Sequence, residues 1–125
     1  MAETTLDRLA GDFFAAVLLV ADAPPGRGVT PAALRGQLIG LLDAFSRHPL
    51  AQASDPHEVE SARFALVVWA DEALLRSHWE GRDDWAHELL QHQLFRTNRG
   101  GDEFYERLAR LRPDQSGARR IFLLC

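Results

Sequence analysis

Cysteine is almost absent from this sequence of 125 residues, in which Cys125 is the only one. A single cysteine cannot form a disulfide within the chain, so the sequence indicates folding in a reducing compartment. Long hydrophobic runs are missing as well, because the longest, Phe13–Ala21, has nine residues and a membrane-spanning helix needs about 20. The segment Met1–Arg8 carries Glu3 and Asp7, unlike the positively charged start of a signal peptide. We therefore expect a soluble chain with no membrane anchor of its own.

An excess of basic residues is also lacking. The chain has 14 Lys and Arg against 18 Asp and Glu, and its formal net charge is −4. Proteins that bind nucleic acid usually carry a basic excess that displaces counterions from phosphates, so we expect no nucleic-acid partner. The hydrophobic share of 46% and the charged share of 26% are typical of globular proteins. The length predicts a single domain over 1–125.

Strand signals are scarce, since no stretch alternates apolar and polar residues for long. Helix signals recur instead, with proline at helix starts and Thr or Asp in capping positions. The sequence predicts an all-α fold, a compact bundle of five or six helices with a central apolar helix. Glycines occur in the expected breaks, among them Ala23–Gly28 and Asn98–Gly101, and the glycines of Asn98–Gly101 can adopt positive φ. The expected helices run from Thr5 to Ala21, Thr30 to His48, Asp55 to Arg76, Asp83 or Asp84 to Phe95, Asp102 to Leu111 and Gly117 to Cys125.

The expected helix Pro56–Arg76 is apolar on almost every side when drawn as a wheel at roughly 100° per residue, so we expect other helices to surround it. Its start has the pattern of a capping box, with Asp55 as cap and Glu58 as the following acid. Glu72 lies in the narrow polar strip, four residues before Arg76, the favourable order for a surface ion pair. Asp71 points among apolar side chains. It is either held by an arginine or by backbone N–H groups at another helix start, or it lines a cleft that binds a partner.

The sequence contains no complete motif for catalysis or metal binding. His87 and His92 resemble a zinc-protease pair but are five residues apart, about 140° around a helix, so they cannot share a metal. A catalytic role for Asp71 needs a matched second group, which the sequence does not supply. We therefore predict no catalytic residue, no metal site and no cofactor. Trp79 and Trp85 flank a loop, which they either pin to the bundle or present to a partner as binding hot spots.

The second half of the chain contains several unusual segments in a fixed order: Ala62–Leu75, Trp79, Trp85-Ala86, Leu89-Leu90, Leu94–Leu108 and Ile121–Cys125. In this order they resemble parts of the DotU/TssL family of bacterial secretion proteins. The first resembles the family's ARYALxxxxDEAxL segment, the fifth resembles its GGexFFxxL block, and the last resembles the start of its YLCLxLGF helix. The resemblance covers about half of the chain, from Ala62 onward.

The resemblance implies a non-enzymatic scaffold in the membrane complex of a type VI secretion system, or of the related type IVB (IcmH/DotU) system. In that family a hook-shaped helical cytoplasmic domain with a cleft precedes a C-terminal membrane helix. It lies at the inner face of the bacterial inner membrane and partners a TssM/IcmF-like inner-membrane protein and baseplate components. The matching acids Asp71 and Glu72 become candidate cleft residues for partner binding. Weaker candidates for partner binding are Trp79, Arg82, Trp85, Asn98 and Asp102.

The sequence ends inside what would be a family helix, without the continuation or the membrane anchor. We therefore expect either a fragment of a longer protein or a shortened relative of the family. An incomplete bundle would leave apolar surface exposed, so we expect a homodimer or a protein partner to cover it. The alternative is a free helical adaptor that uses the same fold outside secretion machinery. Neighbouring genes for the other parts of such a machine would distinguish the two.

Overall fold

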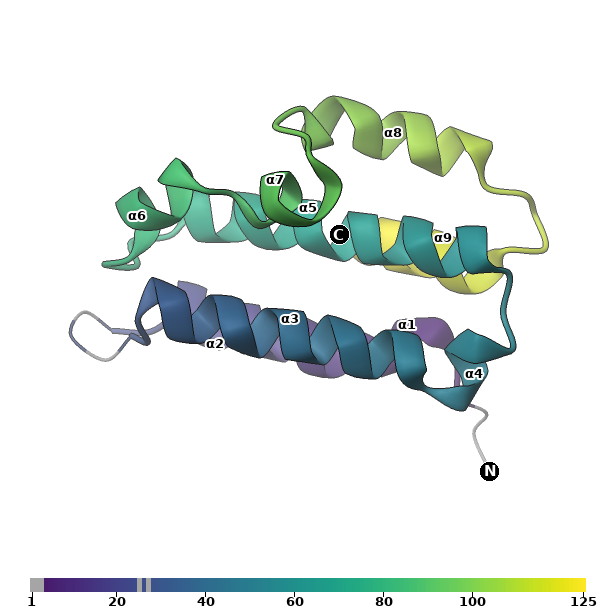
Figure 1. Ribbon diagram of the computed structural model, residues 1–125, viewed down its shortest axis with the longest axis horizontal. Helices are drawn as coiled ribbons and strands as arrows, with labels where there is room; N and C mark the ends of the chain where they lie inside the picture. Colours follow the sequence, from purple (N-terminus) through teal and green to yellow (C-terminus); the bar gives the residue numbers. More distant parts are fainter. Residues whose placement is uncertain (1–3, 25, 27) are drawn as a thin grey trace.

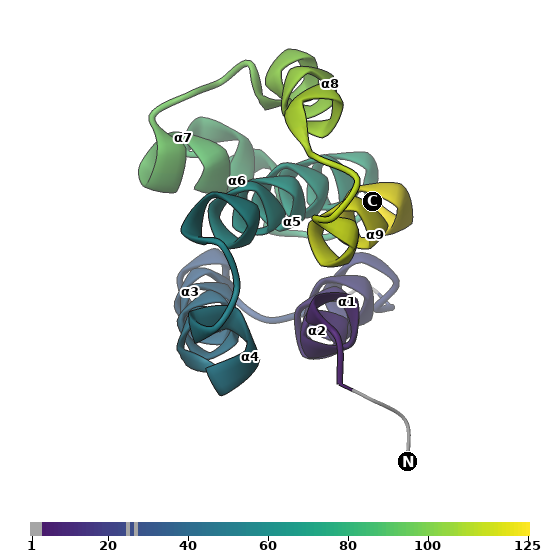
Figure 2. The same ribbon diagram turned by 90° about the vertical axis from the view of Figure 1, so that its right-hand side faces the viewer.

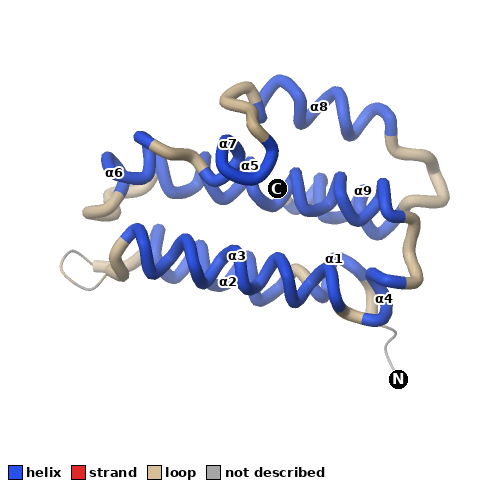
Figure 3. Tube along the Cα trace, viewed as in Figure 1, coloured by secondary structure: helices blue, strands red, loops and turns tan. Residues whose placement is uncertain are grey.

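The computed structural model describes residues 4–24, 26 and 28–125, and this part of the chain contains helices and loops but no strand (Figure 1 and Figure 3). The prediction of an all-α fold is confirmed. Residues 1–3 of the N-terminal segment, and Pro25 and Arg27 of the first expected break, lie outside the described residues. In chain order the helices are α1 (Leu6–Leu9), α2 (Gly11–Ala21), α3 (Pro31–Arg47), α4 (Pro49–Gln52), α5 (Pro56–Arg76), α6 (Arg82–His87), α7 (Leu90–Phe95), α8 (Gly100–Arg110) and α9 (Ser116–Leu124).

Helix α5, with 21 residues, is the central element of the bundle. It packs against α2, α4, α6, α7, α8 and α9, and Figure 2 shows α2 and α3 on one side of it and α8 on the other. Side chains on different faces of α5, such as Phe64, Leu66 and Val67, are all inaccessible to solvent. Burial of apolar surface is the dominant favourable term in folding, so the other helices are organised around α5, as its apolar wheel predicts.

The starts of α3 and α5 follow the expected chemistry. Thr30 Oγ1 accepts a hydrogen bond from Ala33 N at 3.2 Å, and Asp55 Oδ1 accepts one from His57 N at 2.9 Å. A proline occupies the first turn of each helix, where a missing N–H costs nothing. The capping box is not completed, because the Glu58 carboxylate instead accepts a hydrogen bond at 3.2 Å from the backbone of α9. Glu58 therefore joins α5 to α9 rather than closing its own helix end.

Two of the expected helices are divided. The first is interrupted at Ala10, between α1 and α2. The fourth begins at Arg82, after Gly81 rather than after an aspartate, and is interrupted at Glu88 and Leu89 between α6 and α7. A short helix that the sequence does not predict, α4, follows His48, whose Nδ1 accepts a hydrogen bond from Leu50 N at 3.1 Å. Side-chain capping thus starts a new helix where only an end was expected.

Helix α8 begins earlier than the sequence predicts. Its N-cap is Arg99 and its first residue is Gly100, so the expectation that Asp102 caps it is wrong. Gly100 does not have positive φ, and the left-handed residue of this region is Arg96, at φ 59°. Gly100 is needed for a different reason: a Cβ there would lie 2.6 Å from Val68 Cγ2 of α5. The absence of a side chain lets the start of α8 approach the central helix closely.

Candidate functional site

Asp71 is fully buried in α5, with 0% of its surface exposed. Its Oδ1 accepts hydrogen bonds from Trp85 Nε1 at 2.8 Å and Leu90 N at 2.9 Å. Its Oδ2 accepts from Gln91 N at 2.8 Å and from Gln91 Nε2 at 3.1 Å. Burial raises the pKa of the Asp71 carboxyl above its ordinary value, while the hydrogen bonds from Gln91, Trp85 and Leu90 act in the opposite direction.

Asp71 also fixes two further helices. Leu90 and Gln91 are the first residues of α7, whose N–H groups would otherwise lack partners inside the protein. Gln91 Oε1 in turn accepts a hydrogen bond from Gly100 N at 2.8 Å, at the first residue of α8. Of the alternatives for Asp71, the geometry matches an acid held by backbone N–H groups at another helix start. The Asp71 carboxylate lies inside the bundle, beneath the molecular surface, and is not exposed on that surface.

Trp79 and Trp85 also lie inside the bundle. Both are buried, their ring centroids are 5.8 Å apart, and Trp79 Nε1 donates a hydrogen bond to Val29 O at 3.1 Å. The guanidinium of Arg35 lies 4.4 Å from the centroid of the Trp85 ring. Arg82 is exposed, and its Nε donates to the carbonyl of the last turn of α5. These contacts tie the loop between α5 and α6 to the bundle, and neither tryptophan ring presents a face to solvent.

Glu72, in contrast, reaches the surface. Its side chain is 48% exposed and pairs with Arg76 at 3.4 Å, the i,i+4 pair that the sequence predicts. It also lines a groove of about 240 Å³ between α5, α8 and α9, which we call the docking groove. Among the described residues that line the groove, Glu72 is the one with a charged side chain. The lining consists of Val68, Trp69, Glu72, Gly101, Phe104, Tyr105, Leu108, Phe122, Leu123 and Cys125.

The docking groove exposes apolar surface. Tyr105 on α8 and Leu123 on α9 are each 72% exposed. The floor is packed, with the ring centroids of Phe104 and Phe122 4.7 Å apart. Burial raises the pKa of the Cys125 thiol to about 12, so this cysteine carries no thiolate at neutral pH. The groove offers apolar contacts beside a single carboxylate, which is chemistry for binding a protein segment.

The remaining candidates lie elsewhere. Asn98 is exposed in the loop before α8, and Asp102 pairs with Arg99 at 3.7 Å on a different face of α8 from the docking groove. His87 and His92 lie on separate helices, α6 and α7. In the part of the chain that the structure describes, no three His, Cys, Asp or Glu side chains are grouped so that they could hold a metal ion.

Sequence reasoning missed Gln91, which is buried and joins Asp71 to α8. It also missed the exposed aromatic and aliphatic side chains of the docking groove. The groove residues carried a usable signal, because Phe104, Tyr105 and Leu108 recur at helical spacing in a segment that the resemblance covers. A buried glutamine carries no such signal, since its partners are distant in sequence.

Comparison with known families bears on the whole chain. The family model for the type VI secretion system protein DotU matches residues 5–125. The chain belongs to the DotU family. This match confirms the resemblance and extends it from the second half of the chain to the preceding helices, α1 to α4. No curated protein and no solved structure matches the chain.

Membership of the DotU family makes the chain a component of a type VI secretion system, and therefore of an assembly of proteins. The described residues of this DotU-family chain include no helix that is both long enough and apolar enough to cross a membrane. The motif segments of the resemblance form the α5 core, the buried tryptophan cluster and the walls of the docking groove.

Proposed function

We propose that the chain is a non-enzymatic scaffold of the type VI secretion membrane complex, a cytoplasmic domain that docks a TssM/IcmF-like inner-membrane protein and baseplate proteins. The observation that carries the proposal is the docking groove, an exposed apolar surface beside Glu72 in a chain of the DotU family. Exposed apolar patches bordered by polar residues are typical of protein interaction sites.

The walls of the groove define the segment that would fit. Tyr105 and Leu123 offer large exposed side chains, which suit apolar side chains of a partner. Glu72 adds one negative charge, which suits a basic residue at one end of that segment. The partner segment that suits the groove therefore carries apolar side chains and one Lys or Arg.

A binding experiment with matched variants tests this proposal. The purified chain is immobilised, and the cytoplasmic parts of the neighbouring secretion proteins are passed over it. We expect Glu72→Arg and Leu123→Asp to weaken binding of one partner at least about tenfold, because they reverse the charge of the groove and place a charge among apolar contacts.

Leu19→Asp is the matched control, since Leu19 is 75% exposed on α2 and does not line the groove. Circular dichroism establishes that each variant is folded. If the wild-type chain binds none of the neighbouring proteins, or if Leu19→Asp weakens binding as much as Leu123→Asp, the groove is not the docking site. A wild-type chain that binds no secretion protein would favour the free adaptor.

A further inference from the structure

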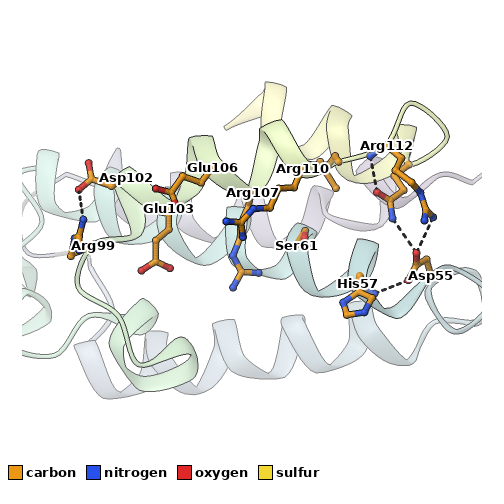
Figure 4. Close-up of a pocket in the computed structure, with 12 residues that line it drawn as sticks. Asp55, His57, Ser61, Arg99, Asp102, Glu103, Glu106, Arg107, Arg110 and Arg112 are labelled. Atoms are coloured by element: carbon orange, nitrogen blue, oxygen red, sulfur yellow. Dashed lines mark hydrogen bonds and ion pairs between the residues drawn. The ribbon is translucent and has the colours of Figure 1, made fainter.

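Helix α8 has a second lined face, apart from the docking groove. A polar cleft of about 680 Å³ lies between α8 and the N-terminal half of α5 (Figure 4). From α5 it is lined by His57 and Ser61, with Asp55 at the helix start. From α8 it is lined by charged side chains, three acids followed by two arginines along the helix. We call it the polar cleft.

Pairs within the chain neutralise the two ends of the polar cleft. At one end Arg99 pairs with Asp102 at 3.7 Å. At the other end Arg112 pairs with Asp55 at 3.1 Å and with Asp114 at 3.2 Å. These pairs hold the charged side chains at both ends, so the chemistry still available for binding lies in the middle of the cleft.

Two arginines in the middle, Arg107 and Arg110, make no ion pair within the described residues. Each follows a glutamate by four residues, Glu103 and Glu106, which is the favourable order for a pair on a helix. Neither pair forms. For the first, Glu103 instead accepts a hydrogen bond from a threonine hydroxyl at 2.7 Å, and Arg107 extends toward α5 (Figure 4).

Arg107 is held in that position by aromatic rings. Its guanidinium lies 4.1 Å from the centroid of the Phe64 ring and 5.8 Å from that of Phe95. Stacking on a ring face orients a guanidinium and leaves the N–H groups at its edge able to donate. Arg110 is one turn further along α8 and lines the same cleft. Two adjacent guanidinium groups with unused donors are therefore presented to one volume.

We propose that the polar cleft binds an acidic segment of a protein partner, with Arg107 and Arg110 donating to its carboxylates. Guanidinium groups match carboxylate geometry with two parallel hydrogen bonds. His57 and Ser61 lie across the cleft on α5 and add donors from the opposite wall. The occupant differs from that of the docking groove, which takes an apolar and basic segment, so the two faces of α8 bind different segments.

The same lining selects against other anions. Glu103 and Glu106 line the polar cleft beside the arginines, and the whole chain has a net charge of −4. A polyanion such as nucleic acid or an anionic lipid surface would bring phosphates against these acids as well as against the arginines. A peptide can instead place one or two carboxylates at the arginines and neutral or basic residues at the glutamates.

A peptide-binding experiment tests the inference without any secretion protein, so its outcome is separate from that of the proposed function. A short fluorescein-labelled peptide with two adjacent glutamates in a Gly-Ser background is titrated with the chain, up to about 1 mM, at low ionic strength. The comparison peptide has glutamine in place of both glutamates. We expect the acidic peptide to bind at least about tenfold more tightly, as charge-assisted hydrogen bonds to two arginines imply.

Variants locate the binding. Arg110→Glu is expected to weaken binding of the acidic peptide at least about tenfold, and Arg107→Gln is expected to weaken it as well. Arg119→Glu changes the net charge by the same amount as Arg110→Glu. Arg119 is exposed on α9, outside the polar cleft, so this variant should bind the acidic peptide within about twofold of the wild-type affinity. Glu72→Arg, in the docking groove, should also leave it unchanged.

Three outcomes overturn the inference. The first is equal affinity for the glutamate and glutamine peptides, or no binding of either. The second is an effect of Arg119→Glu as large as that of Arg110→Glu, which would mean that net charge alone governs binding. The third is binding of a labelled single-stranded oligonucleotide or an anionic vesicle that is as tight as that of the acidic peptide and that depends on Arg110 to the same extent. Arg110 is exposed, so its variant remains folded, and circular dichroism verifies this for Arg107→Gln.

Discussion

Replacing Asp71 with alanine should destabilise the chain by about 4 kcal/mol. The substitution removes the acceptor of four buried hydrogen bonds and leaves without partners the Trp85 indole N–H, the N–H groups of Leu90 and Gln91, and the Gln91 amide. Each buried donor left unsatisfied costs at least about 1 kcal/mol. The free energy of unfolding of a domain this size is about 5–15 kcal/mol, so much of it would be lost.

Urea denaturation followed by circular dichroism and tryptophan fluorescence measures this change, and the midpoint of thermal unfolding should fall by about 15 °C. Glu72→Ala is the control, because the neighbouring acid is half-exposed and its ion pair with Arg76 is worth less than about 0.5 kcal/mol. A loss of less than about 1 kcal/mol for Asp71→Ala would refute the reasoning, since it would mean that the four donors find other partners.

Burial raises the pKa of the Asp71 carboxyl above its ordinary value of 3.8 in the folded chain. The folded state therefore binds the carboxyl proton more tightly than the unfolded state does. The stability that Asp71 contributes then falls as pH rises above 3.8. Denaturation of the wild type and of Asp71→Asn across this range should show that contribution falling in the wild type alone, and a rising contribution would mean that the four donors lower the pKa instead. Gly100→Ala should cost about 2 kcal/mol by thermal denaturation, because its Cβ would meet Val68 at 2.6 Å. Gly101→Ala, whose Cβ would lie at an ordinary 3.5 Å from the Glu72 carboxylate, should cost less than about 1 kcal/mol, and equal losses would contradict the close-approach argument. Thr30→Ala should cost about 1 kcal/mol through loss of the α3 cap, measured in the same way, and an unchanged midpoint would show that the cap contributes nothing.

Local chemistry explains which parts of the fold were predictable. The starts of α3 and α5 follow from a capping side chain and a proline within a few residues of one another, and the burial of α5 follows from its own apolar wheel. The i,i+4 pair of Glu72 with Arg76 is equally local. These features need only the sequence of one helix, so sequence reasoning finds them.

The remaining features depend on residues far apart in the chain. The division of α6 from α7 coincides with a helix start bonded to Asp71, 19 residues before Leu90. Glu58 bonds to Ala118, 60 residues away, although its local pattern predicts a capping box. The sequence does not predict the polar cleft, because Glu103, Glu106 and the arginines of α8 have the spacing of ordinary surface ion pairs. Only the position of Phe64 on another helix shows why Arg107 lies across the cleft instead.

The attachment of α8 to the bundle also determines the order in which the helices open locally and exchange their amide hydrogens. Gly100 is the one fully buried residue of this helix, and its N–H is held through Gln91 by Asp71. A helix with few buried contacts exchanges its amide hydrogens through local openings that cost less free energy than global unfolding. Amides of α8 should therefore exchange with solvent deuterium before those of α5, and a segment bound on either face of α8 would slow that exchange. Helix α8 lines both the docking groove and the polar cleft, so a segment bound at either proposed site would act on a helix that opens locally.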